Sequence, residues 1–215
     1  MKIIRISRNR PSRRALDEAA AVLAAGGLVV MPTETAYGLA ADPSNAAAVR
    51  RIFLVKGRSG RKPLPLIAAS LAGVRRRFVL AGSALGLARR HWPGPLTLVL
   101  AYKKRGTSLA ASAGERTGAV RVPRSAWARA IAAVAGGLVT STSANLSGEA
   151  TLYDPRKVAA SFRGRRHAPD LMLDAGLLPV RRPSTIVRLK RGIIEVLRQG
   201  SVKVKSEKRK EKSSR

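Results

Sequence analysis

A set of hydroxyl, amide and cationic side chains is scattered along the sequence, close to where apolar runs end. Lysine and arginine neutralise phosphate and carboxylate oxygens, and serine, threonine and asparagine orient such groups through hydrogen bonds. Each also has an ordinary structural explanation, such as a cation at a helix C-terminus or an asparagine in a turn. The residue types alone leave both interpretations open. The set comprises Thr33, Thr35, Lys56, Arg58, Lys62, Arg121, Ser143, Asn145, Ser184 and Arg198.

Part of this set lies within residues 29–66. The apolar run at residues 28–31 predicts a buried strand, and Pro32 is expected to end it because proline has no backbone N–H donor. The Thr-Glu-Thr sequence at residues 33–35 then places two hydroxyls and a carboxylate at the end of that strand.

A helix is expected next, with Asp42 or Ser44 as its N-cap. Its apolar face recurs at helical spacing and ends in Lys56. Residues 56–63 follow as a flexible turn that carries several groups able to hold phosphate oxygens. We therefore expect the active site where this turn faces the polar strand end. The apolar face comprises Val49, Ile52 and Phe53.

The charge balance is strongly basic. Against 42 Lys and Arg residues there are only 12 Asp and Glu, which gives a net charge of +30 and a pI near 12.0. This surplus favours a polyanionic partner, although a solvated basic surface is an equally good explanation. The few aromatic residues are not interleaved with basic clusters, which argues against an RNA reader that stacks bases.

Cysteine is absent from the sequence, and this excludes disulfides, thiolate catalysis and cysteine metal sites. No apolar run reaches the length of about 18 residues that a membrane span needs. The N-terminal apolar run is also too short for a signal peptide. We therefore expect a cytoplasmic protein.

Residues 1–200 predict one α/β domain with a twisted mixed β-sheet flanked by helices, because several connections are too short for parallel crossovers. Residues 201–215 carry seven basic and two acidic residues and predict a disordered basic tail. A loop is expected at residues 103–118. Strands are expected at residues 2–6, 28–31, 64–68, 96–102, 119–122, 138–141, 171–173, 184–189 and 193–197. Helices are expected at residues 13–25, 70–77, 83–90, 125–135 and 154–162, besides the helix that ends at Lys56.

Several common catalytic patterns are missing. The sequence contains neither GxGxxG nor GxxxxGK[ST], the loops that cradle phosphates, and it has no GxSxG. His91 and His167 lie far apart without an acidic partner at ligand spacing, so each is interpreted as structural. No metal site of the protein's own is expected.

A series of short motifs nevertheless occurs in a characteristic order. It consists of PTETAYGLAAD, the pair Lys56-x-Arg58 followed by KPLPL, WPGPLTLVL, VRVP, STSANLSGE, PSTIV and VLRQG. Together these motifs resemble the YrdC/Sua5 family of threonylcarbamoyl-AMP synthases, in its short form, over about residues 10–200. The resemblance implies an α/β domain with a basic concave cavity. It also implies synthesis of threonylcarbamoyl-AMP and pyrophosphate from L-threonine, bicarbonate and ATP, for N6-threonylcarbamoyladenosine at position 37 of tRNA.

The resemblance also implies roles for individual residues. Lys56 and Arg58 match the KxR element and are expected to be catalytic and to bind ATP. Four further residues are expected on the nucleotide, and three on threonine, with Arg121 pairing with its carboxylate. One departure is Ile67, which stands where some members have a histidine that contacts threonine. The expected ATP residues are Lys62, Ser143, Asn145 and Arg198, and the threonine residues are Thr35, Arg121 and Ser184.

Substrate and partner expectations follow from the same resemblance. Mg²⁺ is expected to arrive with ATP, since few acidic residues lie near the motifs. The partners expected are tRNA or another RNA, bound through the basic surface, and a threonylcarbamoyl-transferase complex that uses the product. An alternative is a non-catalytic RNA-binding or ribosome-assembly protein, but a mere RNA binder would not need the hydroxyls at strand ends. The related domain of hydrogenase-maturation carbamoyltransferases is a third alternative, and the sequence lacks the zinc-finger-like and acylphosphatase segments of those proteins.

Overall fold

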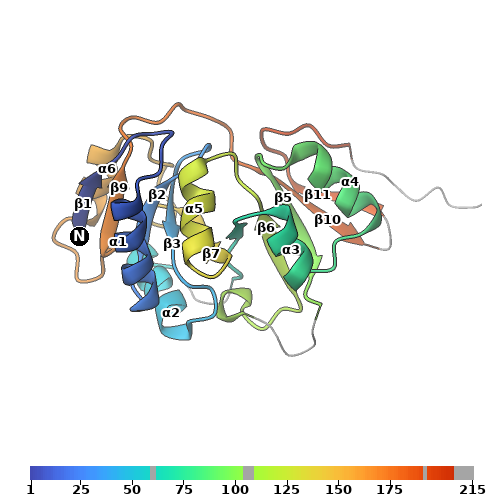
Figure 1. Cartoon of the computed structure of the whole chain (residues 1–215), viewed down its shortest axis with the longest axis horizontal. Coiled ribbons are helices and arrows are strands. Elements are labelled where there is room, and N and C mark those ends of the chain that lie inside the picture. The colour runs from blue at the N-terminus through green and yellow to red at the C-terminus, as the bar shows by residue number, and fades with distance from the viewer. Residues whose placement is uncertain (59–61, 104–108, 191–192, 206–215) are drawn as a thin grey trace, which may run out of the picture.

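The computed structural model describes residues 1–58, 62–103, 109–190 and 193–205, and its strands form two mixed β-sheets (Figure 1). The expected mixed α/β fold is confirmed, with the strands divided between two sheets instead of gathered in one. The first sheet consists, in spatial order, of β1 (Lys2–Arg5), β9 (Leu171–Asp174), β2 (Val29–Pro32), β3 (Tyr37–Ala40) and β8 (Thr142–Ser143). The second consists of β11 (Ile193–Arg198), β10 (Thr185–Lys190), β5 (Leu96–Ala101), β6 (Thr117–Arg121), β4 (Leu66–Ala68) and β7 (Leu138–Thr140).

Both sheets combine parallel and antiparallel pairs. In the first, β9 lies parallel to β1 and β2, whereas β3 is antiparallel to β2 and β8. In the second, β10 is parallel to β5 and antiparallel to β11, and β6 is antiparallel to β5. The short strand β4 then lies between β6 and β7, parallel to the former and antiparallel to the latter.

The helices pack around the two sheets, and α1 and α5 lie side by side on one face (Figure 1). Side chains of α1 and α5 share one buried cluster with strands of both sheets, so these helices hold the sheets together. A short helical turn, η1 (Ala110–Ser112), lies within the expected loop, of which residues 104–108 lie outside the described residues. The helices are α1 (Arg13–Ala24), α2 (Ala46–Lys56), α3 (Leu71–Arg77), α4 (Gly82–His91), α5 (Ala126–Val134) and α6 (Pro155–Phe162). None of the helices in the described ranges is long and apolar enough to span a membrane.

The start of α2 differs from the sequence prediction. Asn45, and neither Asp42 nor Ser44, is the N-cap, because its side-chain oxygen accepts hydrogen bonds from the N–H groups of Ala47 and Ala48. Asp42 instead accepts hydrogen bonds from the backbone N–H and the hydroxyl of Ser44, and so forms a turn before the helix. The apolar face that ends in Lys56 is buried as expected.

The strand ends at Pro32 as expected, and Pro32 is itself the last residue of β2, where it pairs with Tyr37. The strand β3 that follows, within the YGLA sequence, was not expected and forms a hairpin with β2. Tyr37 is buried, and its hydroxyl donates to the carbonyl of Gly176 and accepts from the N–H of Ala175. Burial raises the pKa of Tyr37 to about 12.

The expected hairpin of β10 and β11 is present, and its turn at residues 191–192 lies outside the described residues. The disorder expected from residue 201 onwards does not begin there. Val202 and Val204 pack against the larger core cluster, and the hydroxyl of Thr185 donates to the carbonyl of Val202. The rest of the expected tail, residues 206–215, lies outside the described residues.

Candidate functional site

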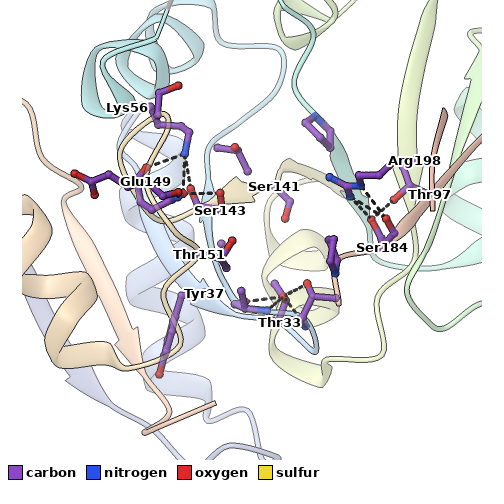
Figure 2. A pocket seen from close by; sticks show the side chains of 18 of the residues that line it. Thr33, Tyr37, Lys56, Thr97, Ser141, Ser143, Glu149, Thr151, Ser184 and Arg198 are labelled. Atoms are coloured by element: carbon purple, nitrogen blue, oxygen red, sulfur yellow. Dashed lines mark hydrogen bonds between the residues drawn. The ribbon is translucent and has the colours of Figure 1, made fainter. Parts of the chain in front are cut away.

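A cavity of about 520 Å³ lies between the two sheets. The β2–β3 hairpin and the turn after β8 line it on one side, and β5, β6 and β11 line it on the other (Figure 2). Of the candidate residues named from the sequence, only Lys62 is not among the lining residues, and it is exposed. The structure therefore brings together Thr33, Thr35, Lys56, Arg58, Arg121, Ser143, Asn145, Ser184 and Arg198.

Lys56 and Arg58 reach the cavity because of the way α2 ends. Gly57 adopts the left-handed conformation, with φ of 60°, and the N–H of Arg58 donates to the carbonyl of Phe53. This ending reverses the chain, so that the last helical residue and the second residue beyond it both line the cavity. The glycine between the two cations is therefore part of how the KxR element works.

The ammonium of Lys56 is buried and surrounded by neutral oxygens. Its Nζ donates to the carbonyl of Ser143 at 2.7 Å, to the carbonyl of Asn145 at 2.8 Å, and to Asn145 Oδ1 at 3.2 Å (Figure 2). Burial lowers the pKa of Lys56 to about 8, and the positive charge of Arg58 acts in the same direction. Among the residues that the structure describes, no carboxylate forms an ion pair with this cation.

Asn145 fixes the rest of the turn that follows β8. Its Oδ1 also accepts a hydrogen bond from the Ser143 hydroxyl at 2.5 Å, and its amide nitrogen donates to the carbonyls of Glu149 and Ala150. The backbone N–H of Ser147 in turn donates to the carbonyl of Lys56 at 2.8 Å. Side chain and backbone together fasten the SxN element to the end of α2.

Arg121 lies on the opposite wall and has a different partner. Its Nη1 donates to Glu34 Oε1, and both side chains are less than one-tenth exposed. The other oxygen of Glu34 accepts from the N–H of Ser125, the N-cap residue of α5, at 3.4 Å. The lone arginine of β6 is therefore neutralised by a carboxylate from the β2–β3 turn.

The free edge of Arg121 faces the cavity. Nη1 alone among its nitrogens has a hydrogen-bond partner in the described part of the chain, yet no fully buried side-chain nitrogen or oxygen there lacks one. The remaining guanidinium nitrogens are consequently accessible, and Arg121 is a lining residue. A ligand carboxylate can bind to this edge while Glu34 holds the other.

The turn that carries Glu34 is shaped by Thr33. The Thr33 hydroxyl donates to the carbonyl of Ala36 at 2.7 Å and accepts from the N–H groups of Thr35 and Ala36 at 3.2 Å. Its Oγ1 also lies 3.0 Å from the hydroxyl of Thr35 (Figure 2). These bonds fix a tight turn that directs Glu34 towards β6 while Thr35 lines the cavity.

Arg198 and Ser184 are in direct contact, although the resemblance assigns one to ATP and the other to threonine. Arg198 Nε and Nη2 donate to the carbonyl of Ser184 at 3.1 and 2.9 Å, and Nη2 also donates to its hydroxyl. That hydroxyl lies 2.9 Å from Thr97 Oγ1 (Figure 2). Burial, followed by the nearby charge of Arg121, lowers the pKa of Arg198. The structure therefore groups Arg198 with the residues expected on threonine.

Sequence reasoning missed several lining residues. Thr97 is a single hydroxyl within the apolar strand β5, and that isolation is the one signal that could have identified it. Ser141, Thr151 and Arg181 carry no comparable signal, because nothing in the sequence places their segments at the cavity. Ile67 is fully buried in the cluster beneath α5 and does not line the cavity, so it provides no contact in place of the histidine. Within the described ranges, no group of three or more His, Cys, Asp or Glu side chains is arranged to hold a metal ion.

Comparison with known proteins identifies the family. The model of the Sua5/YciO/YrdC family, described as "Telomere recombination", matches residues 21–200. A protein of Thiobacillus denitrificans named threonylcarbamoyl-AMP synthase is 40% identical over 176 residues, which cover 81% of this chain and 90% of that protein. A protein of the same name from Bacillus subtilis is 33% identical over 92% of this chain, and the match covers 56% of that longer relative.

Solved structures agree with this match. Sua5 of P. abyssi, determined with L-threonine, superimposes with a TM-score of 0.83 and 33% identity over 93% of this chain and 58% of its own. YciO of E. coli gives a TM-score of 0.83 and 25% identity over 95% of this chain and 98% of its own. The protein is a member of the Sua5/YciO/YrdC family. It spans little more than half the length of the longer Sua5-type relatives and nearly all of the shorter ones.

Proposed function

We propose that this protein is a threonylcarbamoyl-AMP synthase, which joins L-threonine, bicarbonate and ATP and releases pyrophosphate. The observation that carries the proposal is the division of one cavity into two cationic ends. Lys56 and Arg58 lie at one end, and Arg121 and Arg198 lie at the other, with hydroxyl side chains around them. One end suits a polyphosphate and the other a carboxylate. The relatives that bear this name cover most of the chain.

The nucleotide is proposed to bind at the end formed by α2 and the turn after β8. Arg58 is half-buried and lines the cavity, so its guanidinium can bind phosphate oxygens through two parallel hydrogen bonds. Lys62 lies four residues further along the chain and is exposed, so it is suited to the outermost phosphate. Mg²⁺ enters as part of the substrate MgATP, whose own phosphate oxygens hold it.

Threonine is proposed to bind at the opposite end. The free edge of Arg121 takes its carboxylate, and hydroxyls at that end, including those of Thr35 and Ser184, are placed to orient its polar groups. In the L-threonine complex of P. abyssi Sua5, a protein of the same fold binds this amino acid. The match in fold supports an amino-acid site in this cavity.

The chemistry matches the residue types present. The amine of threonine combines with the carbon of bicarbonate, with loss of water, to give a carbamate. A carbamate oxygen then attacks the α-phosphorus of ATP, the bond to the bridging oxygen breaks, and pyrophosphate leaves. Such a transfer depends on positioning and on neutralising charge more than on a covalent nucleophile. The two cationic ends supply both.

RNA is proposed as a further partner, attracted by the net charge of +30. A threonylcarbamoyl-transferase complex that consumes the product is proposed on the same basis as the activity. A purely RNA-binding role is not favoured, because it leaves the buried hydroxyl and amide contacts of the cavity without a purpose.

Pyrophosphate release by the purified protein tests the proposal. Release is expected only when ATP, bicarbonate and L-threonine are all present with Mg²⁺. L-Serine and L-valine serve as controls, because each lacks one feature of threonine, the methyl or the hydroxyl group. Release that is independent of threonine, or no release at any substrate concentration, would contradict the activity.

A further inference from the structure

Lys56 has no hydrogen-bond donor to spare. An ammonium group has three N–H donors. In the structure all of them have protein acceptors, namely two backbone carbonyls and one side-chain amide oxygen of residues 143 and 145. A phosphate oxygen can receive a hydrogen bond from Lys56 only if one of these is broken.

The turn that Lys56 holds does have unused donors. Among the described residues, the backbone N–H groups of Asn145, Leu146 and Gly148 have no hydrogen-bond partner. All three residues line the cavity. Consecutive or nearby main-chain N–H groups in a turn form a favourable site for an anion, as long as the turn keeps its shape.

Together these observations indicate that fixing the turn and binding the phosphates are done by different groups of the KxR and SxN elements. We infer that Lys56 is a positioning residue, whose ammonium fixes the turn at residues 143–148 so that its free backbone N–H groups, together with Arg58, bind the phosphates of ATP. The inference rests on the proposed function for the identity of the ligand. The fixing of the turn is a property of the protein without any ligand.

Few other charged side chains act on the Lys56 ammonium. Arg58, on the same turn of chain, opposes protonation, and Glu149 is the acidic lining residue beyond the held turn. Arg181 lines the cavity from the connector before β10, and Arg121 and Arg198 line the far wall. A neutral lysine has two donors and a lone pair, so one of its three oxygen partners would then face that lone pair. Loss of the proton, whose pKa burial lowers to about 8, would therefore remove one of the three hydrogen bonds that Lys56 donates to the turn.

Hydrogen exchange of the ligand-free protein tests the inference directly. In Lys56→Met, protection of the hydrogen-bonded backbone amides of Ala144, Ser147 and Glu149 should fall about tenfold or more at pH 7, because the three acceptors that fix the turn lose their donor. Lys157→Met, on the exposed face of α6, is the matched control and should leave this protection unchanged.

Kinetics supply a second readout. If Lys56 acts through the turn, the effects of Lys56→Met and Asn145→Ala on kcat/KM for ATP should not add, and the double variant should resemble the worse single variant. If the two residues instead contacted phosphate independently, their separate effects on kcat/KM would multiply in the double variant. Full protection of the amides of Ala144, Ser147 and Glu149 in Lys56→Met, or in the milder variant Lys56→Gln should Lys56→Met not fold, would overturn the inference. Because exchange is measured without substrates, this outcome is separate from a failure of the proposed activity.

Discussion

The two ends of the cavity hold a buried cation in different ways. Lys56 is 5% exposed and is surrounded by three neutral oxygens, whereas Arg121 is 7% exposed and is paired with the carboxylate of Glu34. Neutral dipoles stabilise a charge without cancelling it, so the end with Lys56 keeps its positive field. A carboxylate offsets the charge of Arg121, so at that end Arg121 supplies directed donors while the excess positive field comes from Arg198.

This difference matches the two proposed ligands. ATP brings several negative charges, and a retained positive field favours such a ligand over a neutral one. A threonine carboxylate carries one negative charge and depends more on the geometry of the arginine fork. The difference also teaches that a buried cation's partners, and not its burial alone, indicate the kind of anion that a site accepts.

Removing Arg121 should have the largest effect on stability. In Arg121→Ala the carboxylate of Glu34 remains buried without its cation, and the free energy of unfolding should fall by about 3–5 kcal/mol. In Lys56→Met only neutral oxygens lose their partner, and the fall should be about 1–3 kcal/mol. Urea denaturation monitored by circular dichroism measures both values.

The double variant Glu34→Leu/Arg121→Met is the control for this comparison. Because it removes both charges of the pair together, it should recover much of the stability that Arg121→Ala loses. Equal losses for Arg121→Ala and Lys56→Met would show that the carboxylate is not what separates the two ends.

A conservative change should separate the ligands. Arg121→Lys keeps the charge but lacks the fork, so the KM for threonine should rise about ten- to a hundredfold, which corresponds to roughly 1.5–3 kcal/mol. The KM for ATP should change little. Steady-state pyrophosphate release, with each substrate varied in turn, measures the two constants.

Arg58→Ala provides the reciprocal control, in which the KM for ATP rises and that for threonine stays. If Arg121→Lys raised only the KM for ATP, the proposed ends would have to be exchanged.

The sequence predicted which residues line the cavity better than it predicted the hydrogen bonds and ion pairs among them. Apolar runs and strand ends singled out Arg121, Ser143 and Asn145 as candidates, and the resemblance of the motifs predicted that they belong to one site. They could not show that Glu34 neutralises Arg121, because that pair joins β6 to a turn 87 residues away. Contacts of this kind depend on how two sheets are packed, which no local pattern records.

Two smaller errors of the sequence prediction concern the start of α2 and the C-terminal residues. Asp42, Ser44 and Asn45 are all favourable N-cap residues, so propensity does not choose among them, and in the structure only Asn45 makes the capping hydrogen bonds. Two valines, Val202 and Val204, are too few to stand out in a basic segment, yet both pack against the larger core cluster, and Val202 forms hydrogen bonds with Thr185 of β10.

The pH dependence should differ between catalysis and stability. The pKa of Lys56 is about 8 in the folded protein and near 10.5 when unfolded, so the unfolded chain binds more protons between these values. Stability should therefore rise with pH in that window, as far as Lys56 contributes. By contrast, kcat/KM for ATP should fall above pH 8, at most tenfold per pH unit, because the positive charge at that end of the cavity is lost. Rate profiles and thermal denaturation, measured from about pH 7 to 9.5, should diverge, and a parallel decline of both would contradict the assignment.

Deleting residues 206–215 should have the smallest effect on turnover. Exposed charges beyond about 8–10 Å are screened from the cavity at physiological salt. Affinity for tRNA should fall, and its salt dependence should flatten by about 0.7–0.9 in log–log slope for each phosphate that the shortened chain no longer neutralises. The cut is placed after residue 205 because Val202 and Val204 belong to the core. Loss of pyrophosphate release with unchanged RNA binding would show that the tail serves the cavity and not RNA.

The two hydrogen bonds of the Tyr37 hydroxyl help to hold the walls of the cavity in place. Tyr37 follows the turn that carries Thr35, and it clamps the backbone at residues 175 and 176, where the connector between the sheets begins. The other end of that connector is Ser184, held by Arg198. Both walls of the cavity are thus tied to one piece of chain whose ends are fixed. This connector is therefore a second link between the two sheets, besides the buried cluster that α1 and α5 share with both.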